Sequence, residues 1–169
     1  RYVYLPGERK CIRFARALMT PAIYADVMGT QMIDACHEGD AMAVQGLLKA
    51  KGHPNVEDLH GQTALMRAAH KGEPMVLKCL LQAKAHVNAV NKEGFSALFL
   101  SAVNNNADAV KLLLRGKADL NMRSCKGNSV FDFVQHEGCK DSLAVLTQHR
   151  DTLRYNLATA KAAKEGKKP

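Results

Sequence analysis

The stretch GQTALMRAAHKGEPMVLKCLL, residues 61–81, decides the fold of this chain. A Gly-x-Thr turn leads into a run of small residues, which Gly72 and Pro74 interrupt before the sequence resumes toward Leu80. A single amphipathic helix would not tolerate Gly and Pro two residues apart in its middle. Two short helices joined by a tight turn would place both residues there, with Pro early in the second helix. The stretch therefore predicts a helical hairpin.

The same pattern recurs every 33 residues along the chain. The equivalent positions are a turn glycine (Gly61, Gly94, Gly127), a hydroxyl residue (Thr30, Thr63, Ser96, Ser129), a first-helix interior residue (Ala35, Ala68, Ser101, Val134), a break (Gly39, Gly72, Asn105, Gly138) and a leucine (Leu47, Leu80, Leu113, Leu146). The hydroxyls of Thr63 and Ser96 can cap the first helix of their unit. Because one such unit cannot bury its own apolar face, we expect the units to stack.

These residues resemble the ankyrin repeat family, above all GQTALMRAAHKGEPMVLKCLLQAKAHVNA (61–89) and GFSALFLSAVNNNADAVKLLLRGKADLNM (94–122). In that family a Gly-x-Thr-Pro-Leu-His turn, an Ala-Ala pair, a Gly break, a Leu-Leu pair and a Gly-Ala-Asp-Val-Asn exit recur at this period. The resemblance implies an all-α, ankyrin-like solenoid of about four helix-turn-helix repeats with short β-hairpin-like turns. It covers residues 30–156, as units 30–57, 58–90, 91–123 and 124–156, between a basic N-terminal extension (1–29) and a basic C-terminal tail (157–169).

The resemblance also implies a protein-binding surface on the hairpin tips and the exposed side of the first helices. Carried over by position, that surface consists of Leu59, His60, Gln62, His70, Lys71, Lys92, Glu93, Phe95, Asn104, Arg123, Lys126 and His136. Phe95 is predicted to be an exposed hot spot, because an aromatic residue beside Gly94 at a tip is poorly placed for the core. The alternative is that Phe95 folds over the neighbouring hairpin.

A row of cations departs from the family pattern. Where the family has the Gly that ends the second helix, this chain has Lys51, Lys84, Lys117 and Arg150. A lysine there is predicted to cost about 1 kcal/mol for the left-handed conformation. The row could contact successive phosphates or an acidic protein face. The alternative is that each cation only interacts with the helix macrodipole and caps carbonyls.

The two extensions hold most of the excess charge. The chain carries +8, of which residues 1–29 and 157–169 each carry +3. The N-terminal extension interleaves cations with aromatic residues, which favours an RNA or partner surface, although a helix capping the first repeat is the alternative. The cations predicted to contact nucleic acid or an acidic surface are Arg9, Lys10, Arg13, Arg16, Lys161, Lys164, Lys167 and Lys168.

Motifs for catalysis and cofactors are absent from the sequence. It contains no GxxxxGK[ST], GxGxxG, HExxH or GxSxG pattern and no CxxC pair, so we expect no enzyme activity, cofactor, metal or small-molecule substrate. The five cysteines are predicted to be free thiols, most of them buried, in a reducing compartment. No stretch approaches 18 uninterrupted apolar residues, so no membrane span is expected.

The sequence therefore predicts a non-catalytic scaffold for protein–protein interaction. The placement of charge favours a structural subunit of a large RNA-containing assembly, such as a mitochondrial ribosome, with repeats gripping neighbouring proteins and basic tails touching RNA. The Arg1 start fits either a removed targeting peptide, and so a mitochondrial location, or a fragment. The alternatives are a freestanding cytoplasmic adaptor, a cytoskeletal or axonemal microtubule-associated component, and an enzyme regulator that acts through the face around Phe95.

Overall fold

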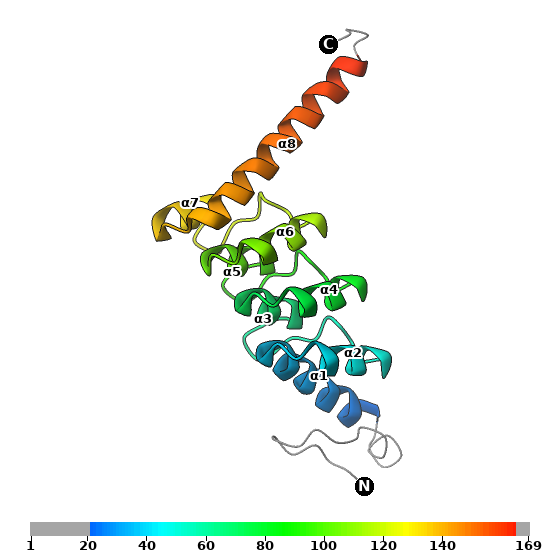
Figure 1. The fold of residues 1–169 in the computed structure, drawn as a ribbon. Helices are drawn as coiled ribbons and strands as arrows, with labels where there is room; N and C mark the ends of the chain where they lie inside the picture. Colours follow the sequence, from blue (N-terminus) through cyan, green and yellow to red (C-terminus); the bar gives the residue numbers. More distant parts are fainter. Residues whose placement is uncertain (1–20, 165–169) are drawn as a thin grey trace.

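The computed structural model of the chain describes residues 21–164. Within this range it is all-α, with three isolated β-bridges and no extended strand. The eight helices form hairpin pairs that stack in chain order (Figure 1). They are α1 (Pro21–Glu38), α2 (Ala41–Lys49), α3 (Ala64–Lys71), α4 (Pro74–Gln82), α5 (Ala97–Val103), α6 (Ala107–Arg115), α7 (Val130–Glu137) and α8 (Lys140–Lys164).

The interruption at Gly72 and Pro74 is the turn of a helical hairpin, as predicted. Gly72 ends α3 at φ +83°, and its N–H donates to the carbonyl of Ala68 at 2.9 Å. Pro74 opens α4, where its missing N–H costs no helical hydrogen bond. The equivalent break residues adopt positive φ in every repeat: Gly39, Gly72, Asn105 and Gly138. The repeated column therefore marks one local conformation.

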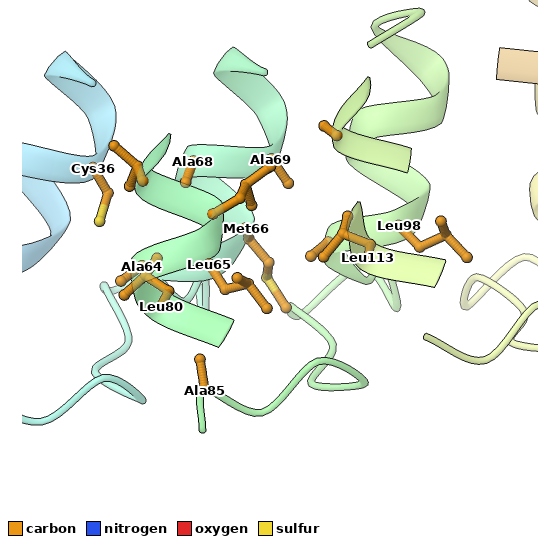
Figure 2. Packing of buried hydrophobic residues seen from close by; sticks show 14 of the residues in the cluster. Cys36, Ala64, Leu65, Met66, Ala68, Ala69, Leu80, Ala85, Leu98 and Leu113 are labelled. Carbon is orange, nitrogen blue, oxygen red and sulfur yellow. The ribbon is translucent and has the colours of Figure 1, made fainter. Parts of the chain in front are cut away.

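The first helices α1, α3, α5 and α7 pack side by side in one layer, and α2, α4, α6 and the start of α8 form the second. Ala68 and Ala69 of α3 are completely buried, because their small side chains let the neighbouring helices approach closely. Leu80 and Leu113 fill the interior of the second layer at full burial (Figure 2). The alanine and leucine columns thus form one continuous core.

The hydroxyl column caps helices in three of the four repeats. The side chains of Thr63, Ser96 and Ser129 accept hydrogen bonds from the backbone N–H groups three residues later. Ser129 and Asp132 form a reciprocal capping box. Thr30 is the exception, because it lies inside α1 and its hydroxyl donates to the carbonyl of Val27 at 2.9 Å.

The predicted boundary between residues 29 and 30 falls inside α1, which begins at Pro21 and continues without a break to Glu38. Gly29 is buried in this helix, and a Cβ added to it would lie 3.2 Å from Val56. Gly29 therefore serves close packing, and the first helix is longer than its counterparts.

The predicted boundary between residues 156 and 157 also falls inside a helix. α8 is 25 residues long, runs without a break from Lys140 to Lys164, and projects beyond the stack (Figure 1). The sequence from Lys140 to Lys164 contains no Gly or Pro that would end a helix. Arg150, the predicted fourth member of the left-handed column, accordingly lies within the helix, with its guanidinium 5.0 Å from the ring centroid of Phe131.

Candidate functional site

Three hairpins connect the repeats at residues 57–63, 90–96 and 123–129. Each is closed by one antiparallel bridge: Glu57–Thr63, Val90–Ser96 and Arg123–Ser129. In each, the residue after the bridge donates its N–H to the carbonyl four residues later at 3.0 Å: Asp58 to Gln62, Asn91 to Phe95, and Ser124 to Asn128. The three hairpins therefore share one turn geometry.

Backbone hydrogen bonds also join successive hairpins to one another. The N–H of Lys92 donates to the carbonyl of His60 at 3.4 Å, and the N–H of Cys125 donates to the carbonyl of Glu93 at 3.0 Å. Because these bonds join backbone atoms, they hold each tip against the next independently of the side chains at the tips. We call the three hairpins together the hairpin ridge.

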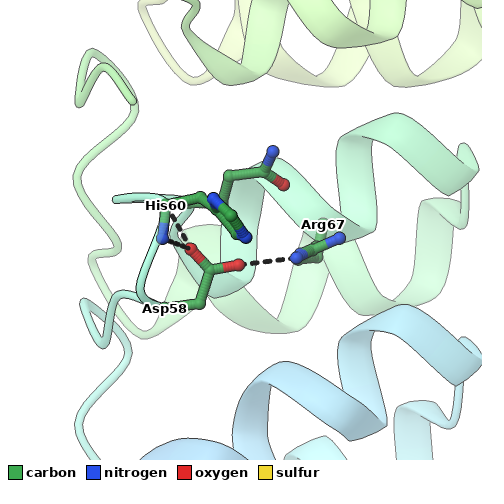
Figure 3. Close-up of polar contacts among 4 residues, drawn as sticks. Asp58, His60 and Arg67 are labelled. Atoms are coloured by element: carbon green, nitrogen blue, oxygen red, sulfur yellow. Dashed lines mark hydrogen bonds and ion pairs between the residues drawn. The ribbon is translucent and has the colours of Figure 1, made fainter. Parts of the chain in front are cut away.

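An ion pair braces the first hairpin of the ridge. Asp58 accepts N–H bonds from His60 at 2.8 Å and Gln62 at 2.9 Å, and its second oxygen lies 2.6 Å from the guanidinium of Arg67 on α3 (Figure 3). Burial acts to raise the pKa of Asp58, but the hydrogen bonds from Gln62, Arg67 and His60 outweigh it and lower that pKa below its usual value. The carboxylate therefore stabilises the turn in its ionised form.

Ten of the twelve residues predicted for the protein-binding surface are exposed. They are Leu59, His60, His70, Lys71, Lys92, Glu93, Asn104, Arg123, Lys126 and His136, whereas Gln62 and Phe95 are half-buried. Leu59 is the most exposed large apolar residue among those described, with 89% of its surface accessible. An almost fully exposed leucine at a rigid tip is well suited to contact a partner.

The prediction that the Phe95 side chain is exposed is wrong, because the residue is half-buried. Its ring stacks on Phe99 with centroids 4.6 Å apart and meets Phe133 edge-on at 5.9 Å. Phe99 and Phe133 are themselves 4.8 Å apart, so the three rings form one cluster between α5 and α7. Aromatic pairs in this geometry stabilise the fold beyond the area they bury. The ring of Phe95 therefore packs against helices α5 and α7, whereas the alternative prediction placed it over the neighbouring hairpin.

Three exposed residues of the predicted surface are held by bonds within the chain. The ammonium of Lys71 donates to the carbonyl of Glu38 at 2.5 Å, which ties α3 to the end of α1. The Asn104 amide donates to the carbonyl of Leu100 at 2.9 Å, and the Arg123 guanidinium to that of Gly127 at 2.8 Å. These contacts support the hairpins and their stacking, so these side chains are less available to a partner than Leu59, Lys92 or Lys126.

The left-handed conformation predicted for the cationic row is present at three of its four positions, while contacts of the row with phosphates or an acidic protein face stay a prediction. Lys51, Lys84 and Lys117 have φ values of 65°, 60° and 66°, and their side chains are exposed. Of the tail cations, Arg9, Lys10, Arg13, Arg16, Lys167 and Lys168 lie outside the described residues, and Lys161 and Lys164 belong to the last turns of α8. Their contacts with nucleic acid or an acidic surface stay a prediction.

Sequence reasoning missed the apolar side chains on the projecting half of α8. Leu153, Tyr155 and Leu157 have 45%, 69% and 63% of their surface accessible. The sequence signal is the spacing of Leu146, Leu153 and Leu157, which lie seven and four residues apart and so share one face of a helix. Detecting it requires knowing that α8 continues past the last repeat.

Other chemistry is limited in the part of the chain that the structure describes. No group of three His, Cys, Asp or Glu side chains there could hold a metal ion. Between residues 21 and 164, no helix has both the length and the apolar character needed to cross a membrane. Cys36, Cys79, Cys125 and Cys139 are free thiols, and of these Cys125 is exposed.

Comparison with known proteins agrees with this geometry. A family model described as ankyrin repeats in three copies matches residues 32–124, more than half of the chain. The match runs from within α1 into the start of the third hairpin and leaves out α7 and α8. No curated protein matches the chain at a significant level.

Proposed function

Because the chain belongs to the ankyrin repeat family, whose repeats are generally non-catalytic interaction modules, we propose that it binds another protein through the hairpin ridge. The observation that carries this proposal is the position of Leu59, 89% exposed at the first of three tips. Backbone bonds from Lys92 to His60 and from Cys125 to Glu93 join these tips, so a partner meets a surface that is already ordered. Lys92, Glu93 and Lys126 supply charges around this apolar contact.

The expected contribution of Leu59 follows from the area it can bury. Covering an exposed leucine side chain stabilises a complex by about 1.5–3 kcal/mol, which corresponds to roughly a tenfold to hundredfold change in affinity. Leu59→Ala should therefore weaken partner binding by about that factor. Met75→Ala is the matched control, because Met75 is 57% exposed on α4, away from the ridge.

The larger assembly that this scaffold serves is part of the same proposal. We infer a structural subunit of an RNA-containing complex such as a mitochondrial ribosome, which implies a mitochondrial location. Support comes from the distribution of charge: each extension carries +3, whereas residues 30–156 carry only +2. In such a complex the ridge would bind a neighbouring protein, and cations of the extensions would neutralise phosphate.

Sedimentation of the full-length chain in cell extract tests this assignment. A ribosomal subunit sediments with large particles, shifts to the top of the gradient after nuclease treatment, and is released by high salt. The Leu59→Ala chain should be released at lower salt than the Met75→Ala chain. Sedimentation as a small species with or without nuclease would instead identify a freestanding adaptor. Pelleting with purified microtubules would identify a cytoskeletal component.

A further inference from the structure

Three lysines occupy a backbone conformation that disfavours them. Lys51, Lys84 and Lys117 follow α2, α4 and α6 with φ between 60° and 66°, where glycine is the preferred residue. An L-residue with a Cβ is strained in this region. The three positions are equivalent in consecutive repeats, so a lysine occupies the same strained backbone conformation three times. Such strain points to a role for the side chain.

Capping of the helix ends does not require these side chains. The backbone N–H of each lysine donates to a carbonyl three residues earlier at 3.1 Å, on Leu48, Leu81 and Leu114. The N–H of the following residue donates to the preceding leucine carbonyl at 2.8–3.0 Å, on Leu47, Leu80 and Leu113. A glycine would make the same backbone bonds without strain.

The ammonium groups have no partner within the described chain. The side chains of Lys51, Lys84 and Lys117 are exposed, and between residues 27 and 159 none of them makes a hydrogen bond or an ion pair. Lys71 and Lys111, by contrast, do find partners, on Glu38 and Asp108. The ammonium groups of the strained lysines are therefore available for contacts outside the chain.

Hydrogen bonds between repeats hold the three lysines in register. The Asn55 side chain accepts from the N–H of His86 at 2.7 Å, and the Asn88 side chain accepts from that of Asp119 at 2.9 Å. Each bond joins the exit of one repeat to the exit of the next, just beyond the lysine. The three lysines thus stand on a connected backbone, each just after one helix of the second layer, α2, α4 or α6.

The chain segments that contain these lysines are basic and include no Phe, Tyr or Trp. Segments 49–56, 82–89 and 115–122 together carry five Lys or Arg and one Asp, a net +4, whereas residues 30–156 as a whole carry +2. None of the three segments contains Phe, Tyr or Trp. Surfaces that bind single-stranded nucleic acid combine charge with stacking aromatic side chains, so this composition favours an acidic protein.

We propose that Lys51, Lys84 and Lys117 form a docking edge, here called the lysine edge, for an acidic α-helix of a partner protein. Packed helices of adjacent repeats lie about 8–10 Å apart, and we expect a similar spacing between consecutive lysines. On an α-helix, carboxylates seven residues apart share a face and lie about 10 Å apart, because each residue rises 1.5 Å. One acidic side chain per two helical turns therefore matches one lysine per repeat.

A pair of synthetic peptides tests the spacing. One is a helix of about 20 Ala- and Gln-rich residues with three glutamates seven positions apart, and the other has the same composition with the glutamates consecutive. Fluorescence anisotropy with the full chain at low salt should show tighter binding of the spaced peptide. Equal affinity for the two peptides, or tighter binding of a single-stranded oligouridine of similar length, would overturn the proposal of an acidic helix.

Three triple variants separate docking from a structural role. Replacing all three lysines with alanine should weaken the spaced peptide about tenfold, since each exposed ion pair contributes modestly, and replacing them with arginine should preserve its binding. Replacing them with glycine should also weaken binding, yet raise the urea midpoint of unfolding. A lower midpoint for the glycine variant, or unchanged peptide affinity for the alanine variant, would contradict the proposal.

The lysine edge is tested independently of the hairpin ridge. Leu59→Ala should leave the affinity for the spaced peptide unchanged, because Leu59 lies in the hairpin 57–63, whereas the three lysines follow the ends of α2, α4 and α6. Failure of the ridge proposal would therefore appear in sedimentation and leave peptide binding intact. A loss of peptide binding in Leu59→Ala would instead show that the peptide occupies the ridge, and would refute the lysine edge.

Discussion

Replacing Gly94 with alanine tests whether the hairpins are locked against each other. Gly94 has φ +81°, and a Cβ added to it would lie 2.6 Å from the backbone nitrogen of Cys125 and 3.0 Å from the carbonyl carbon of Ser124. Both atoms belong to the next hairpin and are backbone, so they cannot rotate away. The substitution must push the hairpins apart and break the bond from the Cys125 N–H to the Glu93 carbonyl.

Gly127 provides a matched control for this substitution. It holds the same turn position with the same φ of +81°, but a Cβ added to it would meet nothing within 4 Å. Gly127→Ala should therefore cost only the left-handed strain, about 1–2 kcal/mol. Gly94→Ala should cost that amount plus the lost hydrogen bond and the displaced packing, in total roughly 2–4 kcal/mol.

Urea unfolding followed by circular dichroism at the helical band measures both free energies. Because the left-handed strain is common to the two variants, their difference reports the contact between hairpins and should be about 1 kcal/mol or more. Equal destabilisation by Gly94→Ala and Gly127→Ala would refute the reasoning, since it would mean that successive hairpins move independently.

Other substitutions test the core, the first hairpin and the thiols. Leu80→Ala removes a fully buried side chain and should lower the free energy of unfolding by about 2–5 kcal/mol in urea; a change under about 1 kcal/mol would argue against the stacked interior. Asp58→Asn should destabilise the chain at neutral pH. The fold lowers the pKa of Asp58, so its contribution to the free energy of unfolding is fully present above the ordinary carboxyl pKa of about 4. That contribution is lost as the pH falls through the lowered pKa. The melting temperatures of wild type and Asp58→Asn should therefore converge in acid. Burial, with a smaller effect of Cys79, raises the pKa of Cys36 to about 12. Iodoacetamide near neutral pH should therefore label exposed Cys125 at least about 100-fold faster than Cys36, as measured by peptide mass spectrometry. Equal labelling of the two thiols would show that α1 opens readily.

The repeat geometry could be predicted from the sequence because local chemistry determines it. Gly72 needs positive φ, Pro74 suits the first turn of a helix, and Thr63 caps the helix that follows it. Each of these preferences acts within a few residues of the chain. The position of Lys84 within the 33-residue repeat also predicted its left-handed conformation, although lysine disfavours that conformation.

The features that could not be predicted depend on contacts between distant residues. Phe95 is half-buried because it meets Phe99 and Phe133, which come from two different helices. Arg150 continues a helix because no breaker follows the last repeat, and its guanidinium lies over Phe131. A prediction from the repeat period gives each residue the same environment as the equivalent residues of the other repeats. Such a prediction fails at the ends of the stack, where a neighbouring repeat is missing.

Amide hydrogen exchange at the hairpin tips tests most directly the claim that the repeats stack into one rigid surface. Lys92, Cys125 and Lys126 are all exposed, but only the first two donate their N–H groups to the preceding hairpin, at 3.4 and 3.0 Å. In the native protein, the Lys92 and Cys125 amides should exchange far more slowly than the Lys126 amide. Equally fast exchange at all three would contradict the account, because the hairpins would then not be joined.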